Sequence, residues 1–186
     1  MNETLKTLLN RRSIRTYKNE QIKDVELQTI LQAGKFAPSA MNEQSWHFTV
    51  IQNKDVLQKI NDVTKTIFEK FEIDISSKKS EAENFSLFYN APTYIIVSAY
   101  EKAIAPQAES ALALGNLFLA AESLGIASCW LHAVKFLYTT DEGKTLFKEL
   151  GIPEGYTPYC SGAFGYNSAE KPAPAARKDG TVNIIK

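Results

Sequence analysis

Apolar residues recur at helical spacing near the start of the chain. Leu5, Leu8 and Leu9 lie three and one positions apart, and they follow Asn2, a residue type that often caps helices. The pattern breaks at the polar residue Asn10. We therefore predict a short amphipathic helix between Asn2 and Asn10.

Helical spacing returns in three further segments bounded by capping or helix-breaking residues. The first is a helix capped by Asp24 and ended by Gly34 and Pro38, and the second is a helix capped by Asp55. The third is a helix from Asp141 to Leu150, which Gly151 and Pro153 stop. The segment from Lys65 to Asn84 is charged and poorly periodic, and it is predicted to be a mobile cover or linker.

A fifth helix is predicted from Glu109 to Leu124, and it is apolar on nearly every side. Such a helix needs burial all round. Spanning a membrane takes about 20 predominantly apolar residues, and here Glu109, Asn116 and Glu122 interrupt a shorter run. Burial in a subunit interface is therefore the preferred explanation.

Runs of β-branched and aromatic residues predict strands, which alternate with the helices. These runs are HFTVIQ (47–52), APTYIIVSAY (91–100), ASCWLHAV (127–134), YCSGAFGY (159–166) and TVNII (181–185). The proline- and alanine-rich connector EKPAPAARKDG suits an extended arm. The order of elements predicts a single α+β domain, 1–186, built round one sheet.

Charge and cysteine content narrow the possible partners and compartments. The 186 residues include 21 Lys plus Arg and 21 Asp plus Glu, so no global positive field attracts nucleic acid or an anionic membrane. Cys129 and Cys160 have neither disulfide-framework nor zinc spacing, which favours a reducing cytoplasm. The N-terminus does not resemble a signal peptide. His47 and His132 have no ligand neighbours at metal-site spacing, so no metal is expected.

The first candidate binding segment is RRSIR. If it is extended, Arg11, Ser13 and Arg15 lie on one side, and Arg12 lies on the other with Ile14. Two guanidinium groups and a hydroxyl then converge, which is a good donor set for a phosphate. A solvated basic helix end is an equally good explanation of this cluster alone.

A second candidate is the turn in APSAMNEQSWHF. Asn42 and Gln44 can each donate and accept, as the imide edge of a base or a flavin requires, although a self-satisfied Asx turn explains them as well. Trp130 and Leu131 are explained by ordinary core packing, and Cys129 by a small core position. The chain has no dinucleotide fingerprint, Walker loop, GxSxG elbow or HExxH motif.

Six motifs taken together resemble the nitroreductase family of FMN-dependent oxidoreductases. They are RRSIR, APSAMNEQSWHF, FYNAPTYIIV, ALALGNLFLAAESLGIASCWLHAV, GAFGY and ARKDGTVNII, in the family's order and across almost the whole chain. The resemblance implies a homodimer of α+β protomers. Each protomer has a central, mostly antiparallel sheet flanked by helices, shared FMN sites at the subunit interface, and a C-terminal arm reaching over the partner.

The resemblance also implies the residues of the FMN site. The segment that binds the FMN phosphate and ribityl chain matches Arg11, Arg12, Ser13 and Arg15, and through Arg15 it reaches the pyrimidine edge. Arg177, with Lys178 as a substitute, matches the basic residue that completes the phosphate site. The partner protomer's turn matches Pro38, Ser39, Asn42 and Gln44, and a flavin-lining polar position matches Glu109. The strand behind the ring matches Trp130, Leu131, His132 and Ala133, with the backbone N–H of His132 as the partner of flavin N5. Ser45 departs from the family, which usually has proline there.

The function implied is electron transfer from NADH or NADPH, through flavin N5, to a small oxidant such as a nitroaromatic or a quinone, by a ping-pong mechanism. The cofactor supplies the hard chemistry, so no side-chain acid, base or nucleophile is needed. Two other classes remain open. One is an FMN-binding storage or sensor protein without turnover, and the other is a nucleic-acid module using RRSIR, which the zero net charge disfavours.

Overall fold

The computed structural model describes residues 1–73 and 85–186. Its helices are α1 (Glu3–Asn10), α2 (Asp24–Lys35), the short 3₁₀ helix η1 (Ala40–Asn42), α3 (Lys54–Lys70), α4 (Pro106–Ser123), α5 (Ala133–Leu137) and α6 (Asp141–Glu149). Its strands are β1 (Trp46–Ile51), β2 (Thr93–Tyr100), β3 (Ala127–Leu131) and β4 (Tyr156–Gly165).

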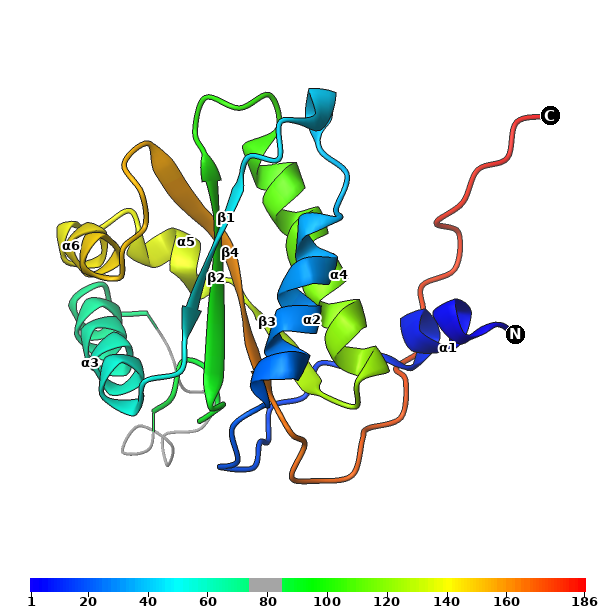
Figure 1. The fold of residues 1–186 in the computed structure, drawn as a ribbon, viewed down its shortest axis with the longest axis horizontal. Helices are drawn as coiled ribbons and strands as arrows, with labels where there is room; N and C mark the ends of the chain where they lie inside the picture. The colour runs from blue at the N-terminus through cyan, green and yellow to red at the C-terminus, as the bar shows by residue number, and fades with distance from the viewer. Residues whose placement is uncertain (74–84) are drawn as a thin grey trace.

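The four strands form one sheet in the order β1-β2-β4-β3, and all neighbouring strands run antiparallel. Helices α2 and α4 cover one face, and α3, α5 and α6 cover the other (Figure 1). This confirms the predicted α+β fold with a central antiparallel sheet.

Strand β2 holds the two layers together because both of its faces are buried. Ile95 and Val97 pack in the core shared with α2 and α4, whereas Tyr94 and Ile96 pack in the opposite core. Only Tyr100 at its end is exposed, so the nearly continuous apolar run correctly predicted a buried strand.

Several helix boundaries differ from the sequence predictions because local hydrogen bonds set them. Asn2 caps α1 as predicted, by accepting from the N–H of Leu5. Asp24 does not cap α2, whose N-cap is Lys23, and Asp55 does not cap α3, because the side chain of the preceding Asn53 accepts from the N–H groups of Asp55 and Val56.

Gly34 does not end α2, which continues to Lys35. A Cβ on Gly34 would lie 2.6 Å from Leu117 Cδ2, so this glycine allows α2 to approach α4 closely. The prediction of a linker from Lys65 to Asn84 is wrong for its first part, because α3 runs to Lys70. Residues 74–84 of that segment lie outside the described residues.

Two strand predictions are also wrong. The run 127–134 is a strand only to Leu131, since His132 is the N-cap of α5, a helix that the sequence analysis missed. Residues 181–185 form no strand in the described structure, and the arm from residue 168 onward is exposed and extends away from the body (Figure 1). The arm pairs with no strand of residues 1–73 or 85–186.

Helix α4 is buried on the side that faces the sheet, but its other side is partly open. Ala113, Leu114 and Leu117 are fully buried, whereas Leu112 is 48% exposed. Among the helices of the described residues, α4 included, none combines the length and the hydropathy that crossing a bilayer requires.

Candidate functional site

The segment from Arg11 to Arg15 leaves α1 in an extended conformation and runs along the free edge of β3. Ile14 donates its N–H to the carbonyl of Ser128 at 3.0 Å, and Ser13 forms a parallel bridge with Ser128. The edge strand β3 thus has β4 on one side and this basic segment on the other. The backbone pairing fixes which way the side chains of the segment point.

Arg11, Ser13 and Arg15 lie on one side of the segment, as its two-residue period predicted. All three act on the same buried group, the thiol of Cys129. Burial raises the pKa of Cys129, while the charge of Arg15, a hydrogen bond with Ser13 and the charge of Arg11 lower it. Two cations and a hydroxyl therefore converge beside the first half of β3.

Each of these two arginines lies over an aromatic ring. The guanidinium carbon of Arg11 is 5.7 Å from the centre of the Phe118 ring, and that of Arg15 is 5.7 Å from the centre of the Tyr89 ring. Both distances suit cation–π contact. Neither ring was predicted to belong to the site. Phe118 has the pattern of a core residue of α4, and Tyr89 lies in the motif FYNAPTYIIV, to which no binding role was assigned.

Arg12 points elsewhere. Its Nη1 donates to the carbonyls of Leu9 and Arg11, at 2.7 and 2.8 Å, so this arginine binds the end of α1. The alternative explanation of RRSIR as a basic helix end thus holds for Arg12. Its Nε is buried and has no acceptor among the described residues, which leaves one donor available for an anionic group.

The carboxyl end of β3 carries the second predicted group of site residues. Trp130 is 38% exposed and meets Phe118 edge to face, with ring centres 6.4 Å apart. Leu131 is buried, whereas the His132 side chain is exposed and Ala133 begins α5. The chain therefore turns from strand to helix at His132, on the same edge strand that the basic segment follows.

The amide-rich turn lies before β1, at the opposite edge of the sheet. Ser39 accepts from the N–H of Gln44, and the Gln44 amide donates to the side-chain oxygen of Asn42, both at 3.1 Å. Met41, Asn42 and Gln44 have positive φ angles of 47°, 59° and 49°. Left-handed backbone is uncommon for residues other than glycine, so interactions around the turn must hold it in place.

Glu109 supplies the strongest of those interactions from the first turn of α4. This carboxylate is 1% exposed. Its Oε1 accepts from the N–H of Ala40 at 2.9 Å, and its Oε2 accepts from Ser45 Oγ at 2.5 Å. The structure thus gives Glu109 a role in holding the turn, since both of its oxygens bind the turn.

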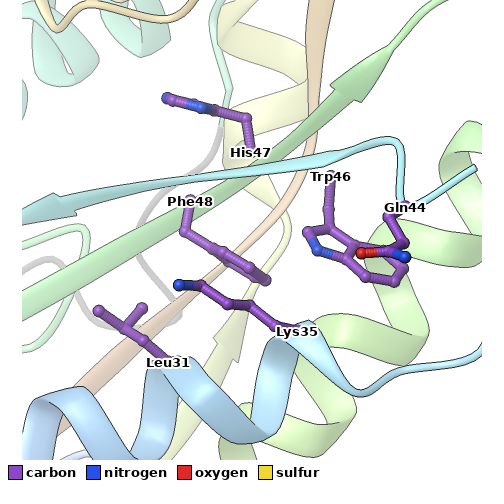
Figure 2. Close-up of a pocket in the computed structure, with 6 residues that line it drawn as sticks. All are labelled: Leu31, Lys35, Gln44, Trp46, His47 and Phe48. Carbon is purple, nitrogen blue, oxygen red and sulfur yellow. The ribbon is translucent and has the colours of Figure 1, made fainter.

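A groove of about 420 Å³ lies between β1 and α2, next to the turn. Figure 2 shows Trp46 and Phe48 projecting from β1 toward Leu31 and Lys35 of α2, with Gln44 at one end and His47 on the other side of the strand. The sequence analysis did not predict this groove. Because β1 is an edge strand, the groove opens beside unpaired backbone groups.

The structure brings together two separate clusters instead of one site. Arg11, Ser13 and Arg15 join the strand with Trp130 and His132 at the β3 edge. The turn with Pro38, Ser39, Asn42 and Gln44 lies at the β1 edge. Three interstrand spacings of about 4.8 Å separate β1 from β3, and a fourth separates β3 from the Arg11–Arg15 segment, so the turn and the arginines lie roughly 19 Å apart across the sheet.

Arg177 and Lys178 join neither cluster within one chain. Both lie in the exposed arm, and neither has an ion pair or a side-chain hydrogen bond with any described residue. Their predicted contribution to the phosphate site requires that the arm reach another copy of the chain.

Comparisons with known proteins identify the family to which this chain is similar. The profile of the Nitroreductase family matches residues 8–166. The crystal structure of a nitroreductase with bound FMN from Bacteroides fragilis has 36% identity and a TM-score of 0.88, covering 100% of both chains. A nitroreductase with bound FMN from Desulfitobacterium hafniense has 33% identity and a TM-score of 0.88, again over 100% of both chains.

A curated relative extends the comparison to a named activity. The FMN reductase [NAD(P)H] of Bacillus subtilis is 28% identical over 183 residues, which cover 92% of this chain and 70% of that protein. The family profile spans most of the sequence, and the two structural neighbours share the whole fold. The chain belongs to the nitroreductase family.

Proposed function

We propose that this protein is an FMN-dependent oxidoreductase that passes electrons from NADH or NADPH to a small acceptor such as a nitroaromatic or a quinone. The observation that carries the proposal is the convergence of Arg11, Ser13 and Arg15 on the free edge of β3, beside the strand end at His132. The FMN in two structural neighbours and the NAD(P)H-dependent activity named for the B. subtilis relative support it.

The donor set fits FMN. Arg11 and Ser13 would bind the phosphate and ribityl chain, and Arg15 would reach the pyrimidine edge. The buried Nε of Arg12 offers a further donor. Trp130, Leu131, His132 and Ala133 would lie behind the ring. Hydride acceptance at N5 and electron delivery to the acceptor are the chemistry that bound FMN supplies.

The protein's own residues would bind, orient and shield the cofactor. The one carboxylate among the site residues, Glu109, has both oxygens engaged by the turn. The side chains therefore hold the binding surfaces in place and leave the redox step to the cofactor. The partly exposed Trp130 face would cover the ring against water.

The proposed site is shared between two copies of the chain. The β1-edge turn and the β3-edge cluster lie too far apart to meet at one ring system within a protomer, so the turn would come from the partner. Exposed apolar residues provide surface for such an interface: Leu5, Leu8, Leu9, Leu112, Val182, Ile184 and Ile185. The arm would then cross to the partner and place Arg177 or Lys178 near the phosphate.

The two buried free cysteines suit a reducing compartment, and we assign the protein to the cytoplasm.

An absorption spectrum tests the proposal. The purified protein should be yellow or should take up added FMN in preference to FAD, since the site offers donors for a terminal phosphate. Anaerobic addition of NADH or NADPH should then bleach the flavin bands, and a quinone should restore them. A protein that ignores FMN would overturn the proposal. A yellow protein that neither nicotinamide reduces would instead be a storage or sensor protein.

A further inference from the structure

A chain of buried hydrogen bonds crosses three strands and ends at the carbonyl of Leu131. The hydroxyl of Tyr94 on β2 donates to Ser161 Oγ on β4 at 2.9 Å, and Ser161 Oγ donates to the Leu131 carbonyl on β3 at 2.9 Å. Tyr94 is 1% exposed and Ser161 is 0% exposed. Water therefore cannot replace either donor.

The direction of this chain is fixed. Burial raises the pKa of the Tyr94 hydroxyl far above its ordinary value, and the hydrogen bond with Ser161 offsets this only in part. Tyr94 thus remains a donor, and Ser161 accepts from it. The Ser161 proton must then point to Leu131, because a carbonyl can only accept.

The Leu131 carbonyl shares its peptide group with the N–H of His132. A trans peptide is planar, so its C=O and N–H point in opposite directions. The carbonyl points inward to Ser161 on β4. The His132 N–H therefore points out from the free edge of β3, the edge that Ser13 follows.

We propose that Tyr94 and Ser161 are positioning residues for the His132 N–H. They fix its direction and strengthen it as a donor toward the cofactor ring. A hydrogen bond accepted at a carbonyl polarises the whole peptide, and consecutive bonds reinforce one another. The proposal rests on the proposed function for its final step, in which the flavin accepts from this N–H.

The two histidines of the chain make the test specific. Labelling with histidine carrying ¹⁵N at the α-amino position gives two backbone amide signals, one from His47 on β1 and one from His132. Tyr94→Phe removes a single hydroxyl, and Ser161→Ala removes the direct donor to Leu131. Ser98→Ala is a matched control, since Ser98 is also a fully buried serine of the sheet but its hydroxyl has no partner in the described structure.

The His132 amide signal should move upfield in Ser161→Ala and, by a smaller amount, in Tyr94→Phe. It should stay in place in Ser98→Ala. The His47 signal should not move in Ser161→Ala or Tyr94→Phe, whereas Ser98 pairs with His47 across β1 and β2, so Ser98→Ala can move the His47 signal alone. An unmoved His132 signal in folded Tyr94→Phe and Ser161→Ala would overturn the proposal. If Ser161→Ala does not fold, the nearly isosteric Tyr94→Phe decides the question.

The same spectra separate this proposal from the proposed function. Adding FMN to the unaltered protein should shift the His132 signal, and the midpoint potential of bound FMN should change more in Ser161→Ala than in Ser98→Ala. FMN that binds without moving the His132 signal would overturn the link between this N–H and the cofactor. A protein that takes up no FMN at all would contradict the proposed function. The His132 amide signals of the FMN-free variants would still test the hydrogen-bond chain.

Discussion

Ser45 Oγ donates a hydrogen bond of 2.5 Å to the buried Glu109, and this contact joins the amide-rich turn to the first turn of α4. The same carboxylate also accepts from the N–H of Ala40. The two hydrogen bonds to Glu109 restrict the turn that carries Asn42 and Gln44.

Replacing Glu109 by alanine should therefore destabilise the protein and weaken FMN binding together. The substitution leaves the half-buried Ala40 N–H and the buried Ser45 hydroxyl without their acceptor, at a cost of about 1.5–3 kcal/mol in the free energy of unfolding. Urea unfolding and fluorescence titration with FMN measure the two effects. Glu122→Ala is the control, since Glu122 is a partly exposed carboxylate of the same helix that forms an ion pair with Lys171 near the surface. Equal stability of the two variants would contradict the anchoring role.

Alanine substitutions of the three arginines in RRSIR should have different effects on FMN binding and on stability. Arg11→Ala and Arg15→Ala should each weaken FMN binding by roughly 1–3 kcal/mol, the range for hydrogen bonds to charged groups. Arg12→Ala removes two hydrogen bonds to backbone carbonyls, so it should lower the free energy of unfolding more than either of the other two. Equal FMN dissociation constants for Arg15→Ala and the unaltered protein would mean that the segment serves only as a helix end.

These residues also mark how far the sequence could predict the structure. The alternation in RRSIR correctly placed Arg11, Ser13 and Arg15 on one side, because a strand period is a local property of the backbone. The apolar run of β2 was predicted for the same kind of reason. Arg12 was placed with the FMN ligands by resemblance alone. Its Nη1 binds carbonyls at the end of α1, whereas its Nε has no acceptor among the described residues.

Long-range contacts explain the remaining differences. Glu109 contacts a turn 69 residues earlier in the chain, and no local pattern reveals that both of its oxygens are used there. The Tyr94 to Ser161 hydrogen bond depends on the register between β2 and β4. The strand expected at 181–185 needs a neighbouring strand, and the described part of its own chain provides none. The partners of Glu109 and Tyr94 are set by the fold of the whole chain. A strand partner for residues 181–185 would be set by the assembly of two chains.

The buried thiols should make the protein less stable in alkali. Burial raises the pKa of Cys160 to about 12, against roughly 8.5 for a free thiol. The folded state therefore holds the proton more tightly. The stabilisation is present in full below about pH 8.5 and is lost as the pH rises toward 12, with a loss of roughly 2 kcal/mol by about pH 10.

Cys160→Ala should flatten this alkaline decline, although it also removes a packed sulfur and so lowers stability at neutral pH. Urea unfolding at several pH values between about 7.5 and 10.5 gives both curves. Tyrosines titrate in both proteins, so the difference between the curves isolates the thiol. Curves that stay parallel across the range would show that Cys160 does not hold its proton more tightly in the folded state.

Steady-state kinetics should follow a ping-pong pattern. In the proposed site, the nicotinamide and the acceptor use the same exposed face of the cofactor, so one must leave before the other binds. Double-reciprocal plots with NADH or NADPH and a quinone or nitroaromatic should therefore give parallel lines. Intersecting lines would mean that both substrates bind together and that the site has room for two.

The arrangement of the site across two copies of the chain gives the most demanding test. Arg15 lies at the β3 edge and Asn42 precedes β1 at the other edge, so in a shared site they meet only when they belong to different protomers. Arg15→Ala and Asn42→Ala should each reduce activity as homodimers, with a second substitution in the same motif if one is not enough. In a mixed dimer, one FMN site contains both substitutions and the other contains neither.

Activity should therefore reappear when the two variants are co-expressed with different affinity tags and the doubly tagged dimer is purified. At most half of the unaltered activity should return, because one of its two sites is intact. If both motifs served the flavin of their own chain, every site would keep one defect and mixing would restore nothing. A monomer in sedimentation, or no recovery in a proven mixed dimer, would contradict the shared site. The exposed Leu112 of α4 and Ile185 of the arm would then need another explanation.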